Sequence, residues 1–186
     1  MSIVLMLSIP LLLSLLPLVE RRINTLAIIN AAGYALVFGI CALFANNFVA
    51  SPLPIRMWGW LYADTLSVFF IFLTCTVSLA ASLYSISYIT AQVKEGEISV
   101  GKAAAYFSLF NLFCFVMLLV PLLNNLAFVW IAIEMTTLIS AFLVGFHNTK
   151  ESVEAAWKYI IICSVGIAFA LLGIIFFTIP LSRTRE

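Results

Sequence analysis

LAFVWIAIEMTTLISAFLVGF, residues 126–146, is an apolar segment long enough to cross a bilayer as a helix. Glu134 lies near its centre and is its only charged residue. A charged side chain at the centre of a membrane-spanning helix costs about 2.5–3.5 kcal/mol on insertion scales, so Glu134 needs a compensating interaction. Acids at this depth commonly mark ion or proton pathways. The segment predicts a transmembrane helix with a functional carboxylate.

The composition of the whole chain is that of an integral membrane protein. Of 186 residues, 65% are hydrophobic and 9% are charged, and the mean hydropathy is +1.19. The nine Lys and Arg residues are scattered in ones and twos and leave a net charge of +1, so no basic surface is available for nucleic acid. We expect the lipid bilayer, and not nucleic acid, to surround this chain.

The sequence predicts an all-α fold of about six transmembrane helices. Helices are expected because backbone groups must be hydrogen-bonded within a segment in lipid, and no run shows the alternation of a barrel strand. The connections are polar or rich in Pro and Trp, and the stretch 46–59 is predicted to be an interfacial loop. The six predicted spans are 2–19, 24–45, 66–89, 103–123, 126–146 and 153–179.

The basic residues of the loops are distributed unevenly. The first, third and fifth loops carry five of them, whereas the second and fourth loops carry Arg56. Because Lys and Arg are enriched in cytoplasmic loops, this bias favours a multi-pass protein of the cytoplasmic (inner) membrane with its N-terminus outside. The five basic residues are Arg21, Arg22, Lys94, Lys102 and Lys150.

Glu134 shares one face of its predicted helix with small or polar side chains, a pattern typical of a face that packs on other helices. We interpret Glu134 as a proton-accepting group whose occupancy responds to a neighbouring cation. The alternative is a carboxyl group that is hydrogen-bonded for packing alone. The residues on this face are Ala127, Trp130, Thr137 and Ala141.

Lys158 is the second candidate for proton translocation. It lies about five residues into the last predicted helix, roughly 7 Å along its axis. Glu154 precedes it by one turn, so the alternative is an interfacial ion pair with a lysine that reaches toward water. The same helix carries a row of mostly small residues suited to close helix contact, which includes Gly166 and Gly173.

Asp64 and His147 are possible secondary sites. Asp64 precedes Thr65, Leu66 and Ser67, where a carboxylate caps the free amides of a helix start, and we favour capping as its role. His147 lies in a polar turn and could titrate near neutral pH, although a solvated loop residue is the simpler interpretation.

The chain contains no motif for a nucleotide, a nucleophile or a metal, so we expect no cofactor and no catalytic centre of its own. The four cysteines each stand alone in an apolar run and are expected to be small core residues. Asn30 and Asn111 are polar residues inside predicted helices and are expected to form interhelical hydrogen bonds. The cysteines are Cys41, Cys75, Cys114 and Cys163.

Four motifs follow one another along the chain with the spacing of a known family: DTLSVFF at 64–70, SLYS at 82–85, WIAIE at 130–134 and EAAWKY at 154–159. Together they resemble the antiporter-like proton-pumping subunits of respiratory complex I, of Mrp-type sodium/proton antiporters and of energy-converting hydrogenases. The stretch 145–159 is most similar to the component F branch of the hydrogenase-4 subunits. The resemblance extends to about residue 177.

The resemblance implies a role for two residues. Glu134 matches the glutamate on the fifth helix of the family, which forms a Glu/Lys pair that gates proton transfer. Lys158 matches a lysine early in the sixth helix, whereas the partner lysine of the pair belongs to a broken seventh helix. The family has about fourteen helices with two inverted five-helix repeats, so we expect this chain to be an incomplete part of that fold. A fragment, a frameshifted reading frame or a split subunit is the expected explanation.

We therefore expect three parts in the chain. They are an N-terminal three-helix segment at residues 1–101, the start of the proton-translocating repeat at 102–179, and a short tail at 180–186. The predicted function is that of a truncated proton-translocating subunit of a complex I-like or group 4 hydrogenase assembly, with redox chemistry in partner membrane subunits. One alternative is an Mrp-type Na⁺/H⁺ antiporter subunit. Another is a membrane scaffold or assembly protein without transport.

Overall fold

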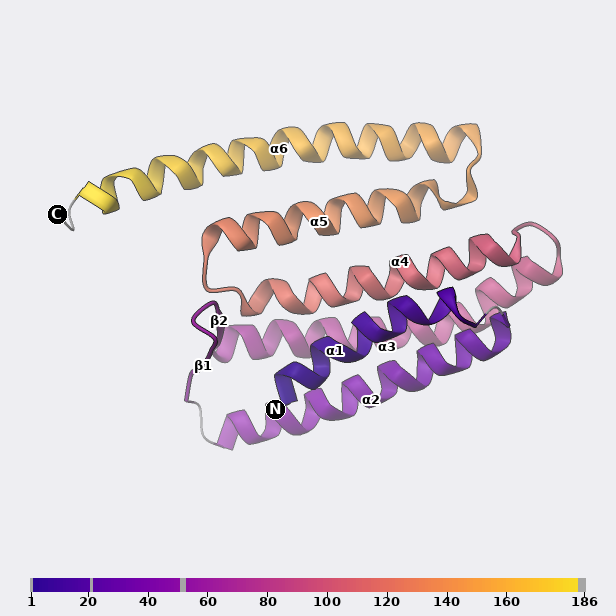
Figure 1. Ribbon diagram of the computed structural model, residues 1–186, viewed down its shortest axis with the longest axis horizontal. Coiled ribbons are helices and arrows are strands. Elements are labelled where there is room, and N and C mark those ends of the chain that lie inside the picture. Colours follow the sequence, from indigo (N-terminus) through magenta and orange to yellow (C-terminus); the bar gives the residue numbers. More distant parts are fainter. Residues whose placement is uncertain (1, 21, 51–52, 184–186) are drawn as a thin grey trace.

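The computed structural model describes residues 2–20, 22–50 and 53–183, with side chains up to residue 178. Within these residues six α-helices follow one another (Figure 1), and the all-α membrane fold predicted from the sequence is confirmed. Five of the helices are long and apolar enough to span a bilayer, and the first is a shorter apolar helix. Their bounds are α1 Ser2–Leu15, α2 Ile23–Ala50, α3 Thr65–Lys94, α4 Val100–Leu119, α5 Leu126–Val144 and α6 Lys150–Arg183.

Several helices are longer than predicted. Helix α2 continues to Ala50, α3 continues to Lys94, and α6 begins at Lys150. The predicted ends were placed where polar residues begin, but such residues can remain helical beyond the hydrocarbon region. At 1.5 Å per residue, the 30 residues of α3 extend about 45 Å, which exceeds a hydrocarbon core of about 30 Å. Of the predicted tail, residues 184–186 lie outside the described part of the chain.

Three 3-10 turns end or connect helices. Leu16–Leu18 (η1) follows α1, Val120–Leu122 (η2) follows α4, and Gly145–His147 (η3) follows α5. The first two contain Pro17 and Pro121 at the start of the turn. Because proline has no N–H to donate and clashes with the preceding turn, both positions favour the end of an α-helix.

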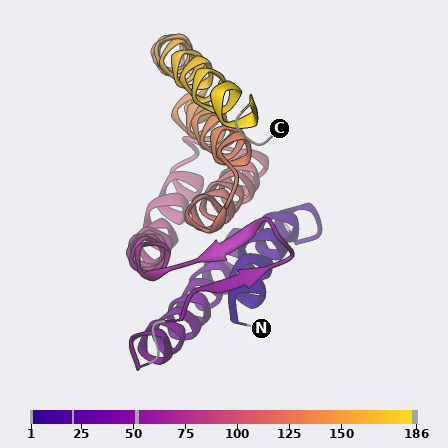
Figure 2. The same cartoon turned by 90° about the vertical axis from the view of Figure 1, so that its left-hand side faces the viewer.

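The stretch between α2 and α3 was predicted to be a loop, but a β-hairpin forms there. Strand β1 (Ile55–Met57) pairs antiparallel with β2 (Leu61–Ala63). Trp58 and Gly59 in the turn have φ angles of 52° and 76°, as a tight hairpin turn requires. The hairpin crosses the end of the helices (Figure 2), where the Asn124 N–H donates to the Trp60 carbonyl over 2.9 Å.

Asp64 caps helix α3. Its carboxylate accepts hydrogen bonds from the Ser67 N–H over 2.8 Å and from the Ser67 hydroxyl over 2.9 Å. Both donors stabilise the charged form, so the pKa of Asp64 is lowered. The backbone N–H of Ser67 has the larger effect, and the Ser67 hydroxyl has the smaller one. This geometry is that of the capping role favoured from the sequence.

We expect Asp64→Ala to destabilise the fold by about 1 kcal/mol, the usual loss of a helix cap. Thermal unfolding in detergent measures the change, and Asp64→Asn, which keeps an acceptor, should lose less. Because the folded pKa is lowered, the contribution of the carboxylate is present above the unfolded pKa of about 3.9 and is lost as the pH falls through the folded pKa. Equal stability of the Ala variant and the parent at pH 7 would contradict the capping role.

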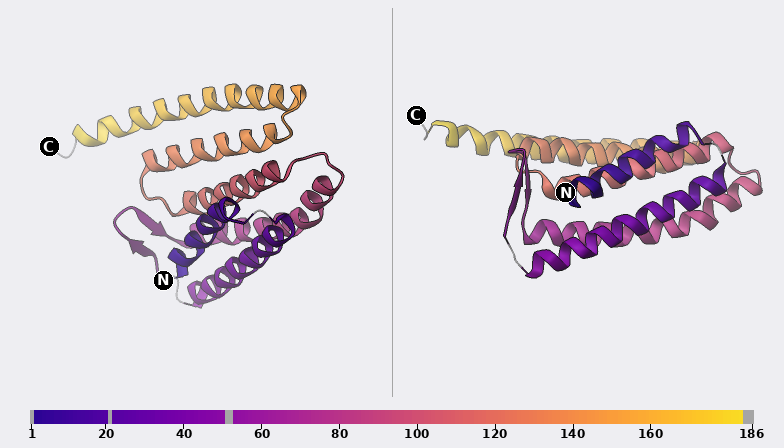
Figure 3. Two further views of the ribbon diagram at one scale, coloured as in Figure 1. Left: turned by 45° about the vertical axis from the view of Figure 1, so that its right-hand side comes forward. Right: turned by 60° about the horizontal axis from the view of Figure 1, so that its bottom comes forward.

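The helices pack in a definite order from the N-terminal half to the C-terminal edge. Helices α1 to α4 pack on one another, α5 packs on α4, and α6 packs on α5 at the edge of the structure (Figures 1 and 3). None of the α6 residues in its membrane-spanning window is buried. Contacts between α1 and α4 cross the boundary at residue 101, and the division into segments stays a prediction.

The basic loops lie at the same end of the structure (Figure 1). The loops between α1 and α2, between α3 and α4, and between α5 and α6 gather there, and the Lys102 ammonium donates to the His147 carbonyl over 3.2 Å. The hairpin with Arg56 lies at the opposite end. Arg21 falls outside the described residues. The grouping agrees with the charge bias of the sequence, and the side of the membrane stays a prediction.

Candidate functional site

Helix α5 has two different packing faces. Ala132 and Ile139 are buried against Val116 of α4 in an apolar cluster. The other face, which carries Glu134, meets α6. This division follows from the sequence, because Ala132 and Ile139 are two turns apart on one face, whereas Glu134 is roughly on the opposite face of the helix.

Three hydrogen bonds connect this second face of α5 to α6. The Ser164 hydroxyl donates to Oε1 of Glu134 over a long 3.4 Å. The indole N–H of Trp130 donates to the Ile167 carbonyl over 2.8 Å. The Ser140 hydroxyl donates to the Tyr159 hydroxyl oxygen over 3.1 Å. Glu134 is therefore held at the α5–α6 interface and not turned freely into lipid.

Among the described residues, one carboxylate oxygen of Glu134 has a hydrogen-bond partner and the other has none. Oε2 is buried and has no hydrogen-bond partner among the described residues. A buried polar atom without a partner costs free energy comparable to a lost hydrogen bond, and more when the group is charged. The remaining oxygen can hold a proton or accept a hydrogen bond from a donor outside the described residues.

Lys158 is not near Glu134. It points roughly 100° around α6 from Tyr159 and roughly 120° from Ser164, the side chains that contact α5, so it is turned away from the α5–α6 interface. Its side chain is 68% exposed and forms an ion pair with Glu154 over 2.6 Å. This i,i+4 pair is the alternative that the sequence left open. The structure does not bring the two predicted proton-translocation residues together.

Asp64 and His147 lie at opposite ends of the structure. Asp64 caps α3 next to the hairpin, and exposed His147 ends the turn η3 between α5 and α6. The His147 ring packs edge to face on Phe146, with 5.4 Å between ring centroids. Neither residue takes part in the α5–α6 contacts around Glu134.

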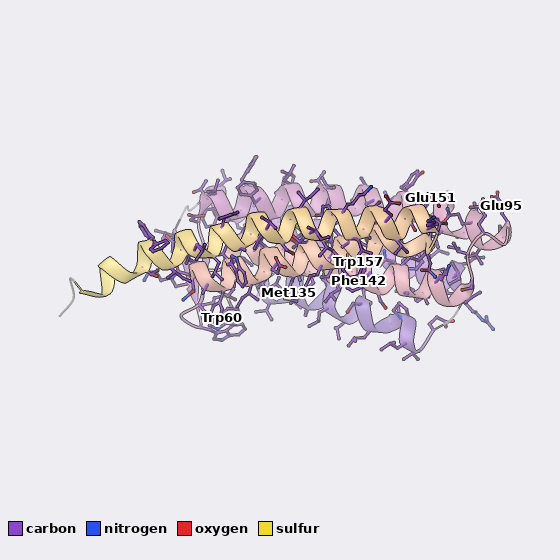
Figure 4. All side chains as sticks on the ribbon, turned by 90° about the horizontal axis from the view of Figure 1, so that it is seen from above. Trp60, Glu95, Met135, Phe142, Glu151 and Trp157 are labelled. Atoms are coloured by element: carbon purple, nitrogen blue, oxygen red, sulfur yellow. The ribbon has the colours of Figure 1, made fainter. Side chains whose placement is uncertain are left out.

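The predicted small face of α5 is partly buried. Thr137 and Ala141 are buried, Trp130 and Glu134 are half-buried, and Ala127 is exposed. On α6, a Cβ atom built at Gly166 or Gly173 would meet nothing within 4 Å, so these glycines do not pack on α5. Seen from the α6 side (Figure 4), Phe142 and Trp157 lie over the α5–α6 pair, and both are exposed.

Sequence reasoning missed Ser164 as the partner of Glu134. The signal was present, because α5 and α6 are antiparallel and joined by a short turn near Thr149. Glu134 lies 15 residues before Thr149, and Ser164 lies 15 residues after it. In an antiparallel helix pair, residues equally far from the turn lie at the same level. Ser164 is a polar residue at that level.

The described residues contain no group of three or more His, Cys, Asp or Glu side chains that could hold a metal ion. The four cysteines are free thiols, and three of them are buried, as expected of small core residues. Cys163 is half-buried.

Comparison with known proteins gives relatives from respiratory and hydrogenase complexes. The chain is 39% identical over 121 residues to a hydrogenase-4 component F homolog of Methylacidiphilum infernorum. This match covers 65% of the chain. It is 33% identical over 148 residues to hydrogenase-4 component B of Escherichia coli, and 28% identical over 144 residues to NADH-quinone oxidoreductase subunit N of Campylobacter concisus. Each of these two matches covers 76% of the chain. No protein-family model matches.

These relatives are much longer than this chain. The matches cover 25%, 20% and 28% of the three relatives, so the chain spans about a quarter of their length. They belong to the group of proteins that the sequence motifs resemble, and they include both hydrogenase-4 and NADH-quinone oxidoreductase subunits. Over about two thirds of its length, this multi-pass membrane chain matches the family of antiporter-like membrane subunits.

Proposed function

We propose that this chain is part of a proton-translocating membrane subunit of a complex I-like or group 4 hydrogenase assembly, and that Glu134 is its proton-carrying group. The observation that carries the proposal is the state of Glu134. It is the only charged residue of a 21-residue apolar stretch, one oxygen has a long hydrogen bond, and the other is buried without a partner among the described residues.

The proposed role follows from the two forms of a carboxyl group. In a medium of low dielectric constant, the neutral form is favoured while no cation is near, and the charged form is favoured when a cation approaches. The Ser164 hydroxyl can donate to either form, so it positions Glu134 without fixing its protonation. Movement of a cation toward or away from Oε2 would therefore load or release a proton.

The cation and the source of energy lie outside this chain in the proposal. Lys158 is paired with Glu154 away from the α5–α6 interface, and it enters as a second proton-handling group rather than as the direct partner of Glu134. Redox chemistry is assigned to partner subunits in this proposal, because the relatives are named as single components or subunits of hydrogenase and NADH-quinone oxidoreductase complexes. The proposed setting is the inner membrane with the N-terminus outside, among other membrane subunits of the complex.

Ion selectivity tests this proposal against the sodium/proton antiporter alternative. The complete complex is reconstituted in liposomes and driven by its electron donor while the internal pH is followed. We expect a pH gradient that a protonophore abolishes and that forms equally in sodium-free buffer. A gradient that requires sodium and is abolished by a sodium ionophore would favour the antiporter alternative.

A scaffold function is favoured by one observation, the open surface at Gly166 and Gly173 of α6. Glycines at such spacing let another helix approach closely. If scaffolding is the whole function, Gly166→Leu should prevent assembly of the complex, whereas Glu134→Gln should change neither assembly nor proton movement. Loss of proton movement in Glu134→Gln with normal assembly would exclude a pure scaffold.

A further inference from the structure

The core shared by α2, α3 and α4 contains a buried polar side chain that no described residue satisfies. Asn30 of α2 is 2% exposed, and neither its amide nitrogen nor its amide oxygen has a hydrogen-bond partner among the described residues. The sequence predicted interhelical hydrogen bonds for both Asn30 and Asn111. Asn111 forms one, with Tyr34 over 2.8 Å, and Asn30 does not. A buried amide with no partner carries a large desolvation cost.

The packing of α2 on α3 shows what lies at the level of Asn30. One turn before Asn30, Ala27 packs in a cluster with Ile89, and one turn after it, Tyr34 packs in a cluster with Leu79 and Ala81. Because the two helices are antiparallel, Asn30 lies opposite the α3 residues between 82 and 86. Ser82 and Ser85 are the buried polar side chains of that stretch.

These neighbours have hydrogen-bonding capacity left. The Ser82 hydroxyl donates to the Leu79 carbonyl over 2.8 Å, which leaves its oxygen free to accept. Tyr34 donates its hydroxyl to Asn111, so its oxygen is also free to accept. The side chain of a helical residue inclines toward the helix N-terminus, which brings Tyr34 toward the level of Asn30. By this register, the buried side chains of Asn30, Ser82 and Tyr34 are at about the same level of the α2–α3 pair.

We propose that this position is an internal water-binding site, in which one or two ordered water molecules join the Asn30 amide to the hydroxyl oxygens of Ser82 and Tyr34. Water supplies both a donor and an acceptor, which the Asn30 amide requires, and a buried water typically makes about three hydrogen bonds to groups of this kind. A side chain from another protein cannot be the partner, because Asn30 is almost fully enclosed by this chain.

In this proposal, water enters from a surface groove between α2 and α3 that reaches the level of the site at Ile86. It has a volume of about 500 Å³ and is lined by residues of the start of α2 and the end of α3, among them Ile28, Ile86 and Thr90. Ile86 belongs to the α3 stretch opposite Asn30. The Thr90 hydroxyl oxygen, one turn further along, is also buried without a partner. Its lining also includes Asn24 at the start of α2 and Lys94 at the end of α3, so the groove is next to the loops that carry basic residues. This site does not involve Glu134 and stands independently of the proposed function.

Radiolytic hydroxyl labelling of the intact complex tests the proposal, because it modifies side chains next to bound water. We expect buried Tyr34 to be labelled in the parent protein, and labelling to fall severalfold in Asn30→Leu, which removes both polar atoms of the amide. Asn47→Leu, at an exposed position near the other end of α2, is the matched control and should leave the labelling of Tyr34 unchanged. An unlabelled Tyr34 in the parent, or equal labelling in Asn30→Leu, would overturn the proposal.

A second measurement does not depend on the folding of a variant. In a cryo-EM map of the parent complex that resolves ordered water elsewhere in the membrane region, we expect a water peak within hydrogen-bonding distance of the Asn30 amide. Direct contact of Asn30 with Ser82 or Ser85, or an empty position beside the amide, would refute the water site.

Discussion

Glu134→Gln is expected to reduce proton translocation to the passive leak of the vesicles while the complex still assembles. Glutamine has nearly the shape of glutamate and can accept the hydrogen bond from Ser164, so the α5–α6 contact should persist. It cannot bind and release a proton at neutral pH. The measurement is the initial rate of internal pH change in proteoliposomes that contain equal amounts of assembled complex.

Two variants control this experiment. Glu97→Gln removes a carboxylate from the exposed loop between α3 and α4 and should leave translocation unchanged. Glu134→Asp keeps a titratable group but shortens its reach, so we expect a reduced but measurable rate. Parent-like translocation in Glu134→Gln would remove this residue from the proton pathway.

The largest effect on stability is expected from Phe107→Ala. Phe107 of α4 is 1% exposed and packs in a cluster with residues of α2 and α3, which include Leu26, Ala27 and Ile89. In soluble proteins, a buried Phe→Ala change costs about 3–5 kcal/mol. Lipid weakens the transfer part of this cost but not the lost van der Waals contacts, so we expect a loss of about 2–3 kcal/mol. Unfolding in detergent by titration with denaturant measures it.

Phe69→Ala provides the comparison for this prediction. Phe69 of α3 is 60% exposed on the surface of the structure, so removal of its ring leaves no enclosed cavity. We expect a change well below that of Phe107→Ala. Equal destabilisation by the two variants would mean that α2, α3 and α4 do not pack around Phe107 as described.

Hydrophobicity alone was sufficient to predict the helices, but not where they end. Apolar runs identify the spans because lipid permits few other structures. The end of a helix beyond the hydrocarbon depends on local capping and turns, such as the hydrogen bonds between Asp64 and Ser67. The prediction that Asp64 caps a helix succeeded because that interaction is local in the sequence.

The hairpin was missed because its stabilising contacts are not local. Its strands have three residues each, too short for a clear alternating pattern. Its position depends on a bridge between Leu61 and Leu123 and on the hydrogen bond from Asn124 to Trp60. These partners lie about 60 residues away, beyond the end of α4. A single sequence does not indicate such a pairing.

The candidate site was predicted in part. The importance of Glu134 was evident from one charge in an apolar segment, and helical periodicity indicated that it faces other helices. The separation of Lys158 from Glu134 was not evident, because it depends on which side of α6 meets α5. That side is determined by packing at Ser164 and Ile167, and both residues look ordinary in the sequence.

The most direct test of the central claim is to observe the protonation of Glu134 itself. Difference infrared spectroscopy of the complete complex, recorded between resting and turning-over states, resolves the carbonyl stretch of a protonated carboxyl group. We predict a carboxyl band that changes with turnover and disappears in Glu134→Gln. A band that is unaffected by Glu134→Gln, or no turnover-dependent carboxyl band at all, would contradict the account.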